Sequence, residues 1–155
     1  SLALLAGVAG QYIGGVIAEG RTLPTVVGLA CLAAAPACWG VGLFSGWVGA
    51  ALAAITIGFY MVQQPALNTL VATLAAPKWR GAAYGLFYAI QFGIGGLGPG
   101  IAGQLDDAGG PSWVFGATAL AFVAAAALSF ALIRMARSAR PAIPSAVPLP
   151  PPLSP

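Results

Sequence analysis

The sequence contains no histidine, and Lys, Arg, Asp and Glu together make up only 6% of its 155 residues. Without histidine, Ser–His and Cys–His catalysis, histidine-bearing metal sites and haem ligation by histidine are excluded. The two cysteines, Cys31 and Cys38, lie in one apolar run rather than in the pattern of a disulfide framework. We therefore predict that the protein is not an enzyme and has neither a metal site nor a cofactor.

Positive charge is also scarce, because the chain has only six Lys and Arg residues. They are too few and too scattered to follow a phosphate backbone, so we expect no nucleic-acid partner. Hydrophobic residues reach 59%, whereas soluble domains are roughly 45–50% apolar and about 25% charged. This composition cannot give a soluble globule a polar surface, and it predicts an integral membrane protein whose partner is the lipid bilayer.

Long uncharged stretches separate the charges. They cover residues 22–77, 81–105 and 108–133, and a helix needs about 20 residues to cross a hydrocarbon core. The first stretch has room for two helices, each of the others for one, and the residues before Glu19 for another. We predict an all-α polytopic membrane protein, a domain over residues 1–138 with five transmembrane helices. Their expected ranges are about 2–18, 25–44, 48–74, 81–104 and 113–135.

Five crossings sort the charges by side of the membrane. The loops at 19–21 and 78–80 and the C-terminal tail share one side, and this side holds all six basic residues. Because basic residues favour the cytoplasmic side, we predict a multi-pass protein of the cytoplasmic membrane, with its N-terminus outside and its C-terminus in the cytoplasm. All four tryptophans lie near expected helix ends, where an amphipathic ring prefers the interface.

The two ends of the sequence carry separate predictions. Residues 139–155 are rich in proline, which predicts a disordered cytoplasmic tail. The sequence starts with Ser1 inside a hydrophobic segment. We expect a fragment that lacks its N-terminal helices, the alternative being a native five-helix protein with trimmed first residues.

Proline and glycine mark two of the expected helices. Pro65 interrupts the third and Pro99 the fourth, and each removes a backbone hydrogen bond and favours a kink. Eight of the 22 glycines lie between Gly81 and Gly103. Spacings of four residues, as in Gly81 and Gly85, let helix backbones approach closely in lipid. These glycines are interpreted either as sites of close helix packing alone, or as a packing contact along which the helix also bends or slides.

Three segments together resemble the C-terminal portion of a major facilitator superfamily transporter, from its eighth helix to its twelfth. They are Gly-Val-Ile-Ala-Glu-Gly-Arg at 15–21, Pro-Lys-Trp-Arg-Gly-Ala-Ala-Tyr-Gly at 77–85, and Gly-Pro-Gly-Ile-Ala-Gly-Gln-Leu at 98–105. The first departs from the family pattern, with Glu19 in place of Asp and Gly20 in place of Arg. Ile94 stands where the family has glycine.

The resemblance implies secondary active transport of a small solute by alternating access, with the missing N-terminal helical half as a partner. It also implies conformational or packing roles for a set of loop and helix residues: Gly15, Glu19, Arg21, Arg80, Gly81, Gly85, Gly98, Pro99 and Gly103. The third expected helix would be the tenth of the family, which lines the cavity. Its polar residues are the cavity candidates: Tyr60, Gln63, Gln64, Asn68 and Thr69. Weaker candidates lie on the first and fourth expected helices: Gln11, Tyr12, Tyr84, Tyr88 and Gln91.

Alternatives remain at this level. Uncharged polar side chains also serve as hydrogen-bonding contacts between helices, and a helical membrane subunit or assembly module that transports nothing is the second hypothesis. No expected helix contains an ionisable group within its span, so a coupling carboxylate belongs to the missing half or the protein is a uniporter. The polar groups favour a neutral or amphipathic solute, and the Gly-Pro element is similar to that of exporters, which favours efflux.

Overall fold

A computed structural model describes residues 2–17 and 23–138, and every regular element in these ranges is helical. The helices are α1 (Leu2–Ile17), α2 (Leu23–Leu43), α3 (Gly46–Leu74), the short 3₁₀ helix η2 (Pro77–Trp79), α4 (Arg80–Gly95), α5 (Gly98–Gly109) and α6 (Pro111–Ser138). The all-helical prediction is confirmed. Glu19, Arg21 and the predicted tail lie outside the described residues.

Three helices are long and apolar enough to cross a membrane by length and composition. They are α2, α3 and the Pro111–Met135 part of α6, while α1 is apolar but shorter. Within each of these helices apolar residues surround the axis, as is typical of helices buried in protein or lipid. The structure thus carries the coarse form of the prediction, a helical chain with segments of transmembrane length.

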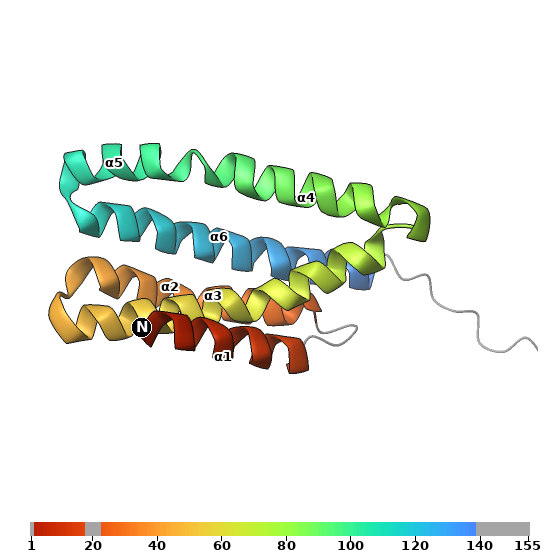
Figure 1. Ribbon diagram of the computed structural model, residues 1–155, viewed down its shortest axis with the longest axis horizontal. Coiled ribbons are helices and arrows are strands. Elements are labelled where there is room, and N and C mark those ends of the chain that lie inside the picture. The colour runs from red at the N-terminus through yellow and green to blue at the C-terminus, as the bar shows by residue number, and fades with distance from the viewer. Residues whose placement is uncertain (1, 18–22, 139–155) are drawn as a thin grey trace, which may run out of the picture.

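Four helices form the packed body of the molecule (Figure 1). Helix α3 packs against both α1 and α2, and α2 packs in turn against α6. Helices α4 and α5 follow each other almost end to end, as Figure 1 shows, and α5 packs against α6. Contacts of α4 with α3 and of α5 with α6 are much less extensive than those within the packed body. Most of the α4–α5 surface is therefore left without a neighbouring helix in this part of the chain.

The core lies where α2, α3 and α6 meet. Its buried apolar residues are Leu23, Val27, Cys31, Ala66 and Ala126, with Phe122 and Phe130 partly buried around them. Small side chains such as Cys31, Ala66 and Ala126 alternate here with large ones such as Phe122 and Phe130, and dispersion between them holds the contact.

The helix expected over residues 81–104 is divided at Gly96–Leu97. The Gly96 N–H donates to the Phe92 carbonyl at 2.8 Å, and the Leu97 N–H donates to the Ile94 carbonyl at 3.0 Å, which closes a tight turn. Pro99 then lies in the first turn of α5, where its missing N–H leaves no helical bond unmade. Proline therefore separates two helices at this point, whereas Pro65 and Pro36 are accommodated inside α3 and α2.

Two glycines shape the other turns. Gly46, the first residue of α3, has φ 65°, and Gly110, after α5, has φ 74°. Residues with a Cβ rarely adopt this region, whereas glycine enters it at no steric cost. Gly110 also donates its N–H to the Asp106 carbonyl at 2.7 Å, which satisfies a carbonyl at the end of α5. Helix α6 begins directly afterwards at Pro111, two residues before the expected start.

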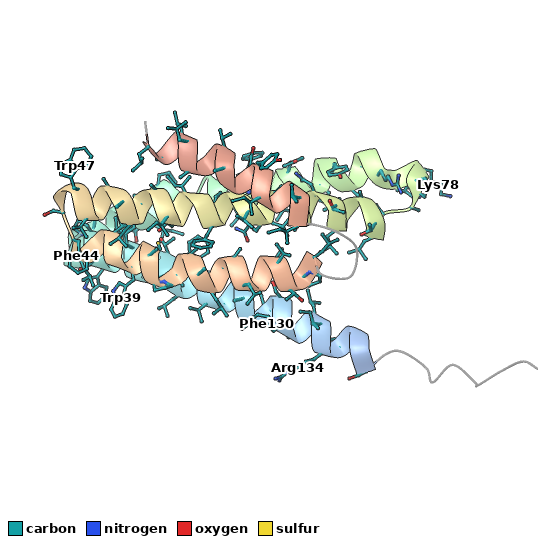
Figure 2. The ribbon with its side chains drawn as sticks, turned by 90° about the horizontal axis from the view of Figure 1, so that it is seen from below. Trp39, Phe44, Trp47, Lys78, Phe130 and Arg134 are labelled. Carbon is teal, nitrogen blue, oxygen red and sulfur yellow. The ribbon has the colours of Figure 1, made fainter. Side chains whose placement is uncertain are left out.

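Two basic side chains and three aromatic ones mark opposite ends of the bundle (Figure 2). Lys78 and Arg134 lie toward one end, while Trp39, Phe44 and Trp47 gather at the other. Lys78 comes from the α3–α4 connection and Arg134 from the last turns of α6. Antiparallel helix crossings bring these two distant segments to the same end of the molecule.

Candidate functional site

The candidate site is built on α3 around Pro65. Pro65 has no N–H to offer the Met61 carbonyl one turn earlier, so the helix lacks one internal hydrogen bond there. Four of the five cavity candidates lie within four residues of this proline. Polar side chains therefore concentrate on the part of α3 whose backbone is also incompletely bonded, and their partners decide what the region can do.

Gln63 points into the core toward α2. Its Oε1 accepts a hydrogen bond from the Cys31 Sγ at 3.1 Å, and both residues are buried. A buried amide oxygen without a partner is unfavourable, so this bond satisfies a group that would otherwise destabilise the fold. The contact joins two helices, and Gln63 is placed as an interhelical contact rather than on an open surface.

Asn68 connects α3 to α4. The Tyr84 hydroxyl donates to the Asn68 backbone carbonyl at 2.8 Å, and the Tyr88 hydroxyl donates to the Asn68 Oδ1 at 3.0 Å. Tyr84 and Tyr88 are four residues apart on α4, so both project from the same side of that helix. The structure thereby brings together three residues of the sequence prediction, and the two tyrosines that were its weaker candidates have the most direct contact with the α3 site.

The remaining cavity candidates have different surroundings. Thr69 donates its hydroxyl to the Pro65 carbonyl at 2.9 Å, a bond within its own helix. The Tyr60 ring meets the Phe122 ring of α6 edge to face, with centroids 6.4 Å apart. Gln64 is half-buried and lies one helical turn before Asn68, so these two amides share one side of α3.

A row of aromatic rings extends this region along α4. Tyr84 and Tyr88 stack with centroids 6.3 Å apart and an angle of 20° between the rings, and Tyr88 and Phe92 stack at 5.9 Å and 19°. Gln91 lies on the same stretch, and its Oε1 is buried without a hydrogen-bond partner among the described residues. We call Tyr84, Tyr88, Gln91 and Phe92 the α4 polar–aromatic stripe.

Gln11 and Tyr12 occupy α1. The Gln11 Nε2 lies 3.5 Å from the Met61 Sδ of α3 and donates a weak hydrogen bond to it. Tyr12 is exposed. These two residues are therefore separate from the α3–α4 region, and Gln11 contributes to the contact between α1 and α3.

The predicted packing glycines lie in open space in this part of the chain. A Cβ built on any of them meets no heavy atom within 4 Å; they are Gly15, Gly81, Gly85, Gly98 and Gly103. Arg80 begins α4 and is exposed, and Pro99 is exposed in the first turn of α5. Any close contact at the Cα positions of these glycines would have to come from outside the described residues.

Two other glycines form the close helix contact that the sequence prediction missed. A Cβ on Gly10 would lie 3.0 Å from the Gly58 carbonyl carbon, and one on Gly14 would lie 2.9 Å from the Val62 carbonyl carbon. Both neighbours are backbone atoms of α3, so no side chain can move aside. Gly10 and Gly14 have the four-residue spacing that permits close approach of helices, and this spacing is the signal that could have identified them.

Two open grooves lie elsewhere on the bundle, one between α1 and α3 and one between α2 and α6. Apolar side chains and glycines line both grooves. Phe59 and Ile13 lie in the first groove, and Trp39 and Leu120 lie in the second. A binding site for a polar solute needs a few convergent polar groups. The lining side chains of the two grooves include a single polar group, the Trp39 indole N–H, so the α3–α4 region is the better candidate.

Metal chemistry has no basis in the described ranges, where no three His, Cys, Asp or Glu residues come together. Comparisons with known proteins add no family. No protein-family model matches the chain, and neither a curated protein nor a solved structure is detectably similar to it. The interpretation of the site therefore rests on its own geometry.

Proposed function

We propose that this chain is part of a secondary active transporter that moves a small solute across the cytoplasmic membrane by alternating access. The observation that carries the proposal is the group of uncharged polar residues around Pro65 in a helix of transmembrane length. Polar groups within a membrane span are unfavourable unless they bind a partner or line a pathway. Gln64, Asn68 and the tyrosines of α4 are the residues that we assign to a solute pathway.

The outer surface supports a location in lipid. Large apolar side chains such as Leu4 and Leu120 are 72% and 71% exposed. Large apolar side chains exposed in this way would cause a protein to aggregate in water, whereas lipid tails solvate them. Lys78 and Arg134 at one end of the bundle also support a cytoplasmic placement of that end, with Trp39 and Trp47 at the opposite interface.

The sparsely packed α4–α5 arm supports alternating access. The break at Gly96–Leu97 and the sparse contacts of α4 and α5 with the packed body give this arm fewer restraints than α1, α2, α3 and α6. Discontinuous helices near a polar site are a recurrent feature of transporters. The α4–α5 arm is the part that we expect to move relative to α3.

The second candidate is a helical subunit that transports nothing. The specific observation in its favour is that Gln63 and Asn68 both accept hydrogen bonds from neighbouring helices. Such bonds stabilise assembly without a solute. The two functions differ in whether the α3–α4 region becomes accessible from both sides of the membrane.

Cysteine accessibility distinguishes the two functions. Gln64→Cys, in the protein expressed from its full coding sequence, should react with a membrane-impermeant maleimide in both right-side-out and inside-out vesicles. Leu120→Cys is the control and should react in neither, because its thiol lies in lipid. Reaction of Gln64→Cys from one side only, or from neither, would refute alternating access and support the subunit function.

A further inference from the structure

The α4 polar–aromatic stripe has a chemical character that the α3 residues alone do not show. Its rings are nearly parallel, and two of them present surface, since Tyr88 is 37% and Phe92 is 71% exposed. The hydroxyls of Tyr84 and Tyr88 are both occupied as donors to Asn68, which fixes the orientation of their rings. An oriented row of rings is a surface on which a further planar ring can pack in the same offset manner.

Gln91 adds a hydrogen-bond acceptor to this surface. Its Oε1 is buried and has no partner within residues 2–17 and 23–138. An acceptor held away from solvent in this way is satisfied when an N–H or O–H group from a bound molecule reaches it. Gln91 lies three residues after Tyr88, a spacing that places the two side chains on neighbouring positions of α4, so packing on the Tyr88 ring and this hydrogen bond can act on the same molecule.

The distribution of charged residues on α3 and α4 restricts the class of molecule that the α4 polar–aromatic stripe can bind. Residues 22–77 and 81–105, which include all of α3 and all of α4 after its first residue Arg80, contain no Lys, Arg, Asp or Glu. Beside Tyr88 and Phe92 an ionic solute would have no counter-charge on either helix, since Arg80 lies about two helical turns before Tyr88. Binding an ionic solute there in an apolar environment would be costly. The unpaired acceptor and the lack of Lys, Arg, Asp and Glu beside Tyr88 and Phe92 favour a neutral molecule with a hydrogen-bond donor.

We propose that the α4 polar–aromatic stripe binds a neutral, planar ring compound that carries a hydrogen-bond donor. This inference rests on the proposed transport function, for which it names the class of solute. The ring packs against Tyr88 and Phe92, and the Gln91 side chain turns outward so that its Oε1 accepts a hydrogen bond from the donor of the compound. Asn68 positions the two tyrosines and does not itself contact the compound.

Binding of 5-fluoroindole tests the proposal, with fluorine NMR of the protein from its full coding sequence in lipid nanodiscs. We expect the resonance to broaden in the presence of the protein. Tyr88→Leu should weaken binding about 2- to 10-fold, the range of an aromatic pair. Phe59→Leu is the matched control, because Phe59 is 38% exposed in the apolar α1–α3 groove, and it should bind as the unmodified protein does.

The hydrogen bond is tested with 1-methyl-5-fluoroindole, which lacks the N–H donor. It should bind about 2- to 10-fold more weakly than 5-fluoroindole, the range of one hydrogen bond, and Gln91→Leu should abolish the difference between the two compounds. This comparison does not depend on the folding of Tyr88→Leu. Equal binding of both compounds by the unmodified protein, equal binding by Tyr88→Leu, or equally tight binding of the cation 1-methylquinolinium would overturn the proposal.

The result is separable from that for the transport function. Indole binding with the expected pattern, but without two-sided labelling of Gln64→Cys, would preserve the site and refute alternating access. Two-sided labelling without indole binding would preserve transport and refute this class of solute.

Discussion

Gly14 and Gly15 are adjacent on α1, yet they should respond in opposite ways to substitution by alanine. A Cβ on Gly14 would lie 2.9 Å from the carbonyl carbon and 3.0 Å from the Cα of Val62, whereas a Cβ on Gly15 meets nothing within 4 Å. Because the atoms near Gly14 belong to the α3 backbone, the whole of α1 must shift to admit one methyl group.

The magnitude follows from two terms. Replacing glycine by alanine within a helix stabilises the fold by roughly 0.5–1 kcal/mol, and both variants gain this term. Overpacking costs Gly14→Ala a further 1–3 kcal/mol or so. The free energies of unfolding of the two variants should therefore differ by about 1–3 kcal/mol, which corresponds to about 2–10 °C in Tm for a chain of this size.

Thermal unfolding with a maleimide dye that fluoresces on reaction with thiols measures this difference. Cys31 and Cys38 are only 1% and 2% exposed, so the dye should react when the helices separate. We expect Gly15→Ala to unfold at or above the temperature of the unmodified protein and Gly14→Ala below it. Equal Tm values for the two variants would refute the close contact of α1 with the Val62 backbone.

Three further perturbations test the contacts of the site and the role of α5. Cys31→Ala should lower the free energy of unfolding by about 1–3 kcal/mol, because it leaves the buried Gln63 oxygen without a donor. Cys31→Ser keeps a donor and should lower the free energy of unfolding less in the same thermal assay. Equal losses of stability would contradict the hydrogen bond between Cys31 and Gln63. Tyr88→Phe and Asn68→Ala should show a coupling of roughly 0.6 kcal/mol in a double-mutant cycle, the average for such bonds between membrane helices, and additivity would refute the interaction. Gly98→Leu should impair transport, because a large side chain there blocks the close approach of another helix to α5. It should not lower Tm, because a Cβ on Gly98 meets nothing within 4 Å in the described ranges. Normal flux would count against a packing role for Gly98.

Much of the fold could be predicted because charge is so rare in this sequence. In a bilayer a long uncharged stretch has to fold into helices whose backbone bonds are satisfied internally, which leaves the charged residues to mark the connections. The turn at Gly46 and the loop before Pro111 lie between the expected helices. The division at Gly96–Leu97 was foreseen only as a kink at Pro99, since the sequence shows where a donor is missing but not where the chain restarts the helix.

The partners of the polar residues could not be predicted, and the reason is physical. Apolar residues surround the axes of α2 and α3, so no amphipathic pattern indicates which side of each helix faces its neighbour. Nothing in the sequence distinguishes Gln63, which meets Cys31 in the core, from Gln64, which shares a side with Asn68. Only the packed helices fix these rotations.

The glycines show the same ambiguity. Gly10 and Gly14 have the same four-residue spacing as Gly81 and Gly85. The first pair meets the α3 backbone, while Gly81 and Gly85 meet nothing near their Cα positions in the described ranges. Spacing permits close approach, but the position of the neighbouring helix decides where it occurs.

Labelling of intact cells tests most directly whether the bundle crosses the membrane with its basic end in the cytosol. Lys78→Cys and Ser45→Cys place one exposed thiol in the α3–α4 connection and one in the α2–α3 turn, while the native cysteines are buried. The account predicts that a membrane-impermeant maleimide added outside tags Ser45→Cys and leaves Lys78→Cys unmodified until the cells are permeabilised. Tagging of Lys78→Cys from outside, or of both sites equally, would contradict it.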